Sequence, residues 1–151
     1  MTTASSQTLS EDDLQEIQEA LDIPLSGSAD LFTAADFCGT LVSVMVVCGD
    51  KYYRLALCGR LSHALTVLRQ RCVDVMPDWM VSQLTVETVP LSTLPESWQE
   101  TDLLLDYAQA LTLTLSGGTL LAKNGQDLAG LLHDVVYFLV DELKSPRFEK
   151  A

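Results

Sequence analysis

The pattern of hydrophobic and polar positions changes along the chain, and near the N-terminus it predicts a helix. Leu14, Ile17 and Leu21 recur at helical spacing, while acidic residues lie off that stripe. Ser10 precedes them, and serine is a favourable N-cap because its hydroxyl accepts from a free backbone N–H. The pattern therefore predicts a short amphipathic helix of about three turns that begins after Ser10 and ends before Pro24.

From residue 41 the pattern becomes typical of strands. Residues 41–48 and 51–58 are rich in β-branched and aromatic side chains, and Gly49-Asp50 between them predicts a two-residue hairpin turn. In that register one face is core and the other is still largely apolar, so we expect another element or a partner to cover it. The main apolar residues of this second face are Leu41, Met45, Val47 and Tyr52.

The rest of the chain alternates between helical and strand patterns. Apolar residues at helical spacing predict helices over residues 61–75 and 128–143. Period-two alternation predicts a strand over 80–89 and a second hairpin over 111–122, and residues 101–108 fit either a helix or a strand. The predicted fold class is α+β, with a mixed or antiparallel sheet of about five strands packed by helices, in the rough order α-β-β-α-β-β-β-α.

The length favours one domain. A chain of 151 residues is close to the most frequent size of a single domain and can bury a core without metals or disulfides. We expect residues 1–10 to be a disordered tail, residues 11–145 to form a single α+β domain, and residues 146–151 to be a loose tail. The start has neither the basic residues nor the apolar run of a secretory signal, so the expected location is cytoplasmic.

Charge narrows the possible partners. The chain has 21 acidic residues and 9 Lys or Arg, a net charge of -12, which argues against nucleic-acid binding. The bases are unevenly placed, because residues 51–72 hold five of them and no acid. These cations either neutralise acids on neighbouring elements or form a docking patch for an acidic partner segment. They are Lys51, Arg54, Arg60, Arg69 and Arg71.

No catalytic, cofactor or metal site is predicted. The four cysteines lack zinc-site spacing and read as small buried hydrophobic residues, and phosphate-loop and serine-hydrolase motifs are absent. Asp102 and Asp106 would share a face of a helix, where a solvated pair is the simpler interpretation than a divalent cation site. A thiol enzyme that uses Cys72 with His63 stays open as an alternative, since such pairs form in space rather than in sequence.

The order helix, hairpin, helix, strands, helix in a short acidic chain resembles the class I chaperones of type III secretion systems. The segments that carry the resemblance are the helix over 14–21, the hairpin over 41–58, and the helices over 61–75 and 128–143. The resemblance implies a small bacterial cytoplasmic α+β homodimer that binds an extended effector segment on exposed hydrophobic strands and helix faces. The chain departs from that family in lacking an early third strand and in its proline-bearing connection over 90–98, and no family site residue can be transferred.

The predicted function is therefore a non-catalytic, acidic protein-binding module. It would act as a chaperone or adaptor for one protein partner, through an exposed apolar surface, as a homodimer that contacts neither nucleic acid nor membrane. The alternative is an acidic inhibitor, either a nucleic-acid mimic or a toxin-immunity protein, that blocks a basic site on its target. The predicted partner-binding residues are Leu41, Met45, Val47, Tyr52, Arg54, Arg69, Arg71, Tyr137 and Phe138.

Overall fold

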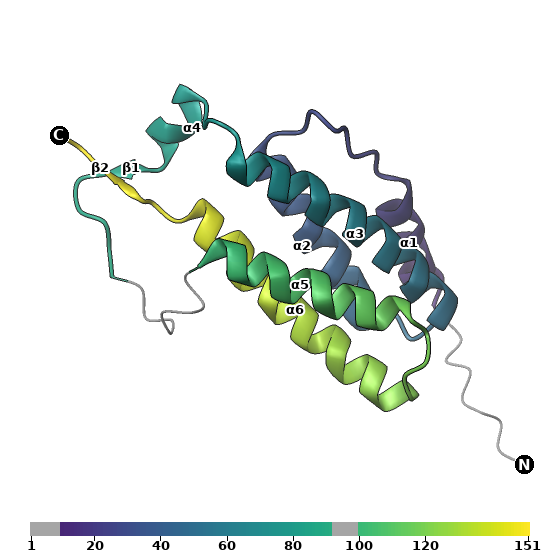
Figure 1. The fold of residues 1–151 in the computed structure, drawn as a ribbon. Coiled ribbons are helices and arrows are strands. Elements are labelled where there is room, and N and C mark those ends of the chain that lie inside the picture. The colour runs from purple at the N-terminus through teal and green to yellow at the C-terminus, as the bar shows by residue number, and fades with distance from the viewer. Residues whose placement is uncertain (1–9, 92–99) are drawn as a thin grey trace, which may run out of the picture.

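The computed structural model of the chain describes residues 10–91 and 100–151. Within these ranges the chain is predominantly helical, as Figure 1 shows. The elements are α1 (Glu11–Asp22), α2 (Leu31–Val47), α3 (Lys51–Val73), α4 (Asp78–Gln83), β1 (Thr85–Val86), α5 (Thr101–Ser116), α6 (Ala122–Lys144) and β2 (Phe148–Glu149).

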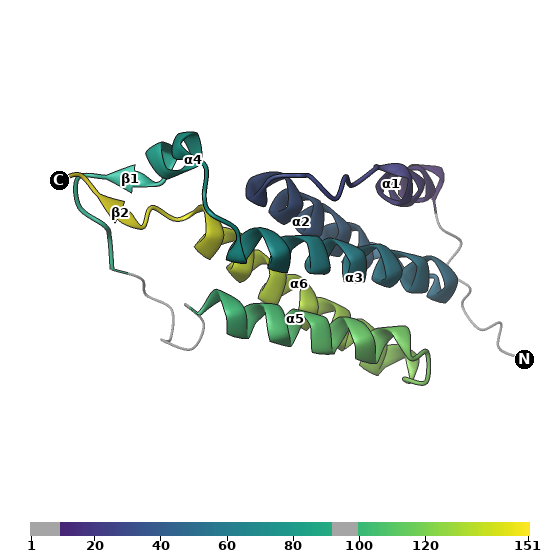
Figure 2. The same ribbon diagram turned by 45° about the horizontal axis from the view of Figure 1, so that its top comes forward.

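Helices α2, α3, α5 and α6 form a four-helix bundle. Helix α2 packs against α3 and α6, and α5 packs against the same two helices, so the four occupy the corners of a square. Each helix runs antiparallel to both neighbours, as in other bundles joined by short turns (Figure 1). Residues 48–50 and 117–121 connect the helices at one end, which we call the turn end. The opposite end carries α4, β1 and β2 and is called the strand end (Figure 2).

The bundle core consists of aliphatic side chains from all four helices. Helix α2 is apolar around most of its circumference because α1, α3 and α6 all cover it. The largest side chains with almost no exposure are Ile17, Leu41, Met45, Leu57, Leu61, Leu65, Leu68, Met80, Leu104, Leu105, Leu132 and Leu139.

The predicted N-terminal helix is confirmed. Ser10 Oγ accepts a hydrogen bond from the backbone N–H of Asp13 at 3.1 Å, which satisfies one free donor of the first turn. Ile17 and Ala20 are the buried residues of α1. The helix lies across α2 and α3, on the side of the bundle away from α5 and α6 (Figure 2).

The predicted α+β fold class is wrong. Among the described residues the strands are β1 and β2 alone, each two residues long and paired in parallel, with Thr85 opposite Phe148. The sheet of about five strands and the order α-β-β-α-β-β-β-α are replaced by a helical bundle.

The first predicted hairpin is instead a turn between two helices. Asp50 is the N-cap of α3, and its carboxylate accepts from the backbone N–H groups of Tyr52 and Tyr53 at 2.9 and 3.1 Å. Gly49-Asp50 therefore starts a helix instead of closing a β-turn. Residues 41–47 are helical because other helices cover their apolar side chains on three sides, which outweighs their preference for strands.

The second predicted hairpin is also wrong, because residues 111–115 form the last turns of α5. The hydroxyls of Thr112 and Thr114 donate to the carbonyls of Ala108 and Ala110 at 2.7 and 2.9 Å, so these threonines are accommodated in a helix. No hairpin follows, since the chain turns at residues 117–121 directly into α6.

Other segments agree in part. The helices predicted over 61–75 and 128–143 exist as parts of the longer α3 and α6, and residues 101–108 are helical. The predicted strand over 80–89 is mostly α4, with only β1 extended. The predicted disordered tail lies almost wholly outside the described residues, and so does most of the connection over 90–98. The segment expected to be a loose C-terminal tail contributes β2. None of the helices in the described ranges has the length and apolar character needed to cross a membrane.

Candidate functional site

A cavity of about 500 Å³ opens at the turn end, between the α2–α3 turn and the α5–α6 turn. It is large enough for a small ligand or for one or two side chains of a partner. Its lining residues are Gly49, Lys51, Arg54, Leu55, Leu115, Gly118, Leu120, Leu121, Ala122, Lys123, Gly125 and Gln126.

Every charged residue in this described lining is a cation. Lys51, Arg54 and Lys123 line the cavity and no Asp or Glu does, although the chain as a whole has a net charge of -12. The two nearest acids along the chain are engaged elsewhere: Asp50 caps α3, and Asp127 pairs with Lys123 at 3.0 Å. The cavity is thus a local exception to the acidity of the protein.

Arg54 connects the two turns that enclose the cavity. Its Nη2 donates to the carbonyl of Cys48 at 3.0 Å and to Oε1 of Gln126 at 2.9 Å. Gln126 in turn donates through Nε2 to the carbonyl of Val46 at 2.8 Å. Nε of Arg54 is buried and has no hydrogen-bond partner in the described part of the chain.

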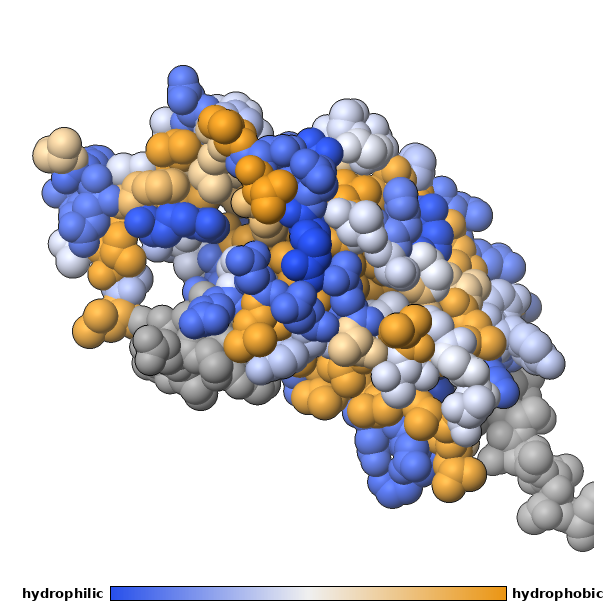
Figure 3. All heavy atoms as spheres, viewed as in Figure 1, coloured by the Kyte–Doolittle hydropathy of each residue, from blue (hydrophilic) through white to orange (hydrophobic). Residues whose placement is uncertain are grey.

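Large exposed apolar side chains lie at the same end of the bundle, and one of them, Leu121, lines the cavity. Tyr52 is 81% exposed, Leu121 75%, Leu113 75% and Val47 58%. We call these four residues the apolar rim. Figure 3 shows hydrophobic side chains gathered over α5 and the lower edge of the turn end. Exposed apolar side chains that gather around a cavity mark an interaction surface more often than isolated ones do.

Three of the predicted partner-binding residues therefore lie together, namely Val47, Tyr52 and Arg54. Leu41 and Met45 were assigned to the same surface, but they are 1% and 0% exposed in the core. The physical reason is the period: an alternating strand would place them beside Val47, whereas a helix turns them inward. In this conformation neither can contact a partner.

Arg69 and Arg71 lie farther along α3 and hold neighbouring segments. Arg69 donates to Asp106 and to Gln109 of α5, each at 2.7 Å. Arg71 pairs with Asp74 at 2.9 Å and donates to the carbonyl of Gly27 at 2.9 Å. Neutralisation of nearby acids, one of the two interpretations of the basic segment, is confirmed for these two arginines.

The basic segment over residues 51–72 also contains Arg60 and Lys51. Arg60 donates to the carbonyl of Ile23 at the end of α1, and so ties a further segment to α3. Lys51 lines the cavity and forms no ion pair with any described residue.

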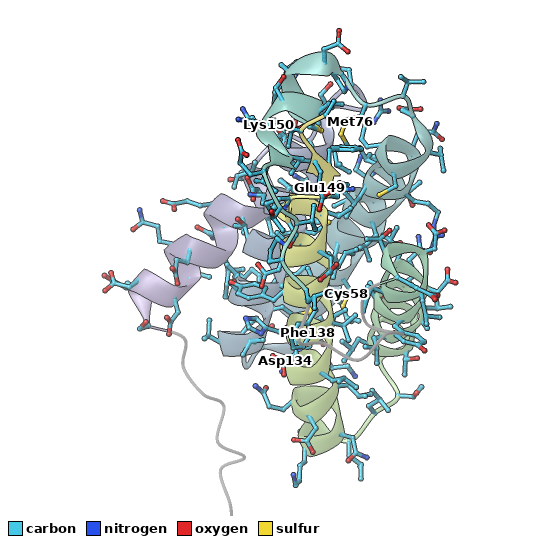
Figure 4. All side chains as sticks on the ribbon, turned by 90° about the vertical axis from the view of Figure 1, so that its left-hand side faces the viewer. Cys58, Met76, Asp134, Phe138, Glu149 and Lys150 are labelled. Carbon is cyan, nitrogen blue, oxygen red and sulfur yellow. The ribbon has the colours of Figure 1, made fainter. Side chains whose placement is uncertain are left out.

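Tyr137 and Phe138 are on α6 and do not line the cavity; Phe138 is labelled in Figure 4. Tyr137 shares a hydrogen bond with the hydroxyl of Ser43 and packs on the ring of His133, with centroids 4.1 Å apart. Phe138 is half-buried and packs against the core. The structure therefore does not join these two residues to the other predicted partner-binding residues.

The candidate thiol–imidazole pair does not form. Cys72 and His63 both lie on α3, nine residues apart, which corresponds to about 13 Å along a helix axis. Burial raises the pKa of Cys38 to about 12 and also raises the pKa of Cys72. A nucleophilic cysteine needs the opposite shift.

The described residues also contain no metal-binding constellation. No group of three or more His, Cys, Asp or Glu side chains converges among them. Asp106 pairs with Arg69 at 2.7 Å and is exposed to solvent. This agrees with the interpretation of Asp102 and Asp106 as a solvated pair of carboxylates.

A second cavity, of about 250 Å³, lies at the strand end. Cys72, Met76, Met80 and Leu143 form the sulfur-rich, apolar part of its lining, and Met76 is visible near the top of Figure 4. The charged residues of the lining are Asp30, Asp74, Arg71 and Arg147. Arg147 also lines it and donates to the carbonyl of Leu143.

The four-helix arrangement differs from the α+β fold that the resemblance to class I secretion chaperones implies, so that resemblance assigns no role to any residue here. Neither a protein-family model, nor a curated protein, nor a solved structure matches this chain.

Proposed function

We propose that this chain is a non-catalytic protein-binding module, a chaperone or adaptor, that binds an apolar and acidic segment of a partner protein at its turn end. The observation that carries the proposal is that Leu121, 75% exposed, lines a cavity whose described charged residues are all cations, and that Tyr52, 81% exposed, directly follows the lining residue Lys51. Such a surface offers apolar contact area and attraction for negative charge in one place.

The two components of the surface would do different work. Burying a large apolar side chain contributes about 1.5–3 kcal/mol, so the apolar rim supplies affinity. Lys51 and Arg54 would select acidic partners and raise the association rate, because charge at an interface acts mainly on partner choice and encounter.

The helical architecture also favours one binding mode. β1 and β2 are two residues long, so neither offers an edge on which a partner strand could add. The turn end instead presents the ends of four rigid helices around a cavity. A partner helix or turn that inserts apolar side chains between the two connections fits this shape.

We further propose that the module works in the cytoplasm and that a homodimer, if it forms, uses a different face. Two turn ends placed together would bring Lys51 and Arg54 against the same cations of the second copy, which is unfavourable. Tyr107 and Leu131, 42% and 44% exposed on α5 and α6, offer an apolar alternative.

Co-purification from the native host tests the proposal. The variant Tyr52→Ser with Leu121→Ser removes two residues of the apolar rim. A matched control, Val75→Ser with Leu91→Ser, removes two apolar residues that are 94% and 97% exposed outside the turn end. We expect a specific protein to co-purify with the wild type and the control, and to be lost with the rim variant. Equal recovery with both variants would show that the turn end is not the binding surface.

One observation favours the alternative function of an acidic inhibitor. Asp12, Glu16 and Glu19 follow one exposed face of α1 at helical spacing, which produces a ridge of carboxylates. The variant Asp12→Asn/Glu16→Gln/Glu19→Gln separates the two functions. If binding is lost in this variant and falls steeply with salt, the ridge is the binding surface; if binding survives, the turn end is.

A further inference from the structure

We infer that the turn-end cavity is an oxyanion-binding site that takes the phosphate group of a phosphoester. The inference goes beyond protein binding, because it concerns the polar interior of the cavity and would hold even if the apolar rim bound nothing. It rests on the charges of the lining, on the fixed position of Arg54, and on the uncapped first turn of α6, whose residues line the cavity.

The charges come first. Lys51 and Arg54 of α3 and Lys123 of α6 approach one cavity, and the described lining contains no carboxylate. Asp127, outside the lining, pairs with Lys123 at 3.0 Å, so an anion in the cavity gains mainly from Lys51 and Arg54. Lys51 has no ion pair among the described residues, so its ammonium group is available to a ligand.

Arg54 is oriented before any ligand arrives. Two hydrogen bonds from its Nη2, to Cys48 and Gln126, hold the guanidinium group between the two turns. Because the group is already fixed, little conformational entropy is lost on binding. Its Nε is buried without a described partner, as are those of Arg60 and Arg71, and guanidinium N–H groups suit the geometry of phosphate oxygens.

Backbone N–H groups of α6 add to these side chains. Ala122 and Lys123 form the first turn of α6 and line the cavity, and no side chain caps this end of the helix. The free N–H groups and the helix dipole favour a negative charge there, which adds to the three cations.

Gly125, in the first turn of α6, allows this helix to come close to Arg54, whereas the approach at Gly118 is an ordinary contact. Gly118 has a positive φ of 68°, and a Cβ there would lie 3.7 Å from Cε of Lys51. A Cβ on Gly125 would lie 3.0 Å from Nη1 of Arg54, closer than ordinary packing allows. A side chain at position 125 would therefore displace the guanidinium group.

The size of the cavity indicates a phosphoester. A volume of about 500 Å³ exceeds what a bare phosphate ion needs and leaves room for the group that carries it. The phosphate group could come from a small free molecule or from a phosphorylated side chain of the partner, and the two sources share the same chemistry at the cavity.

Titration by amide NMR tests the site directly. The full chain is titrated with inorganic phosphate and with pyrophosphate, while sodium chloride keeps the ionic strength constant. We expect saturable shifts of the amides of Gly118, Ala122, Lys123 and Gly125, and at least about tenfold weaker binding in Lys51→Gln, because one charge-assisted hydrogen bond is lost. Lys150→Gln, which removes a cation at the strand end, should bind as the wild type does.

A second variant guards against a folding defect. Arg54 joins two turns, so its removal can disturb the fold, whereas Gly125→Ala keeps the arginine and only shifts its guanidinium group. We expect Gly125→Ala to keep its helical circular dichroism and to bind pyrophosphate at least about tenfold more weakly. Wild-type shifts that are absent, that do not saturate, or that persist unchanged in Lys51→Gln and Gly125→Ala would overturn the inference.

Two peptides identify the source of the phosphate. A nine-residue peptide with a phosphoserine between leucines is compared with inorganic phosphate, with its unphosphorylated form as the control. Tighter binding of the phosphopeptide, reduced by Tyr52→Ser, supports the site and assigns the phosphate to a partner protein. Equal affinity for phosphopeptide and phosphate supports the site and assigns a small free phosphoester. If the phosphate titration fails while the co-purified protein is still lost with the rim variant, only the oxyanion site is refuted.

Discussion

The two ends of the bundle use the same residue types in different ways. Arginines at both ends bond within the protein: Arg147 donates to the carbonyls of Glu142 and Leu143, Arg71 pairs with Asp74, and Arg54 donates to Cys48 and Gln126. Both Arg71 and Arg54 also have a buried Nε without a described partner. The difference lies in the lysines, because Lys150 at the strand end pairs with Glu87 at 3.3 Å, whereas Lys51 at the turn end has no ion pair among the described residues and is left available to a ligand.

The two cavities show the same contrast. The strand-end cavity is lined by sulfur and aliphatic side chains together with two acids, Asp30 and Asp74, and two arginines, so its charges balance. Burial lowers the pKa of Arg147, one of these arginines. Backbone hydrogen bonds join the C-terminal segment to the end of α4 here, since the N–H groups of Arg147 and Phe148 donate to the carbonyl of Leu84 at 3.0 and 3.2 Å. The turn-end cavity is twice as large, at about 500 Å³ against 250 Å³. A region whose polar groups are already paired gives little for a ligand to gain, so the turn end is the better candidate.

The largest expected effect is on partner binding. Tyr52→Ser with Leu121→Ser should lower the affinity for the partner at least about a hundredfold, because each residue contributes about 1.5–3 kcal/mol when buried. Both residues are highly exposed, so the free energy of unfolding should stay within about 0.5 kcal/mol of the wild type. Isothermal titration with the co-purified protein and urea unfolding measure the two quantities. A large loss of stability would mean that these side chains belong to the fold and not to an interface.

The next effect concerns the arginine that joins the turns. Arg54→Ala removes its hydrogen bonds to Cys48 and Gln126 and should lower the free energy of unfolding by about 1.5–3 kcal/mol. Lys51→Ala should change it by less than about 0.5 kcal/mol, because Lys51 has no described ion pair. Urea unfolding of both variants measures this difference. Equal effects would remove the distinction between a cation that supports the fold and one that is available to a ligand.

A pH effect follows from the buried thiol of Cys38. Burial raises its pKa from 9.0 to about 12, so between these values the unfolded chain has lost this proton while the folded chain keeps it. The folded state is then disfavoured by up to about 1.4 kcal/mol per pH unit as the pH rises above 9.0, and the contribution is constant below it. Urea unfolding between pH 8 and 11 should show a steeper decline for the wild type than for Cys38→Ala. Parallel declines would contradict the assigned shift.

The smallest effect separates the two roles of Lys123. Asp127 pairs with it at 3.0 Å on an exposed part of α6, and such pairs contribute about 0.3–0.5 kcal/mol. Asp127→Asn should therefore lower stability only slightly, and it should strengthen pyrophosphate binding about twofold because Lys123 is released toward the cavity. Amide NMR titration against the wild type measures the gain. Weaker binding in this variant would show that Asp127 supports the site.

The sequence predicted those helices whose local signals agree with their packing. α1 has a capping serine, a polar face and one apolar stripe, so it can be predicted from its local sequence alone. The later part of α3 and most of α6 can be predicted for the same reason. Residues 41–47 cannot be predicted in this way, because their β-branched residues indicate a strand and only contact with three other helices makes them helical.

The candidate site was predictable in its residues but not in its location. Val47, Tyr52 and Arg54 were identified from an apolar face and a basic segment, and they do meet at the turn end. Lys123, Leu113 and Leu121 were missed, because they come from a part of the chain more than 50 residues away that only the bundle brings alongside. The one available signal was that Lys123 follows an acid-free segment just before the last helix.

The sequence by itself determined the acidity, the basic segment at 51–72 and the amount of apolar surface to be buried, because these depend only on composition and order. Tertiary structure alone decided which apolar residues became core and which cations stayed available. Helix packing assigns each face of a helix to a neighbour or to solvent, and for a segment that is apolar on all sides no local pattern specifies that choice.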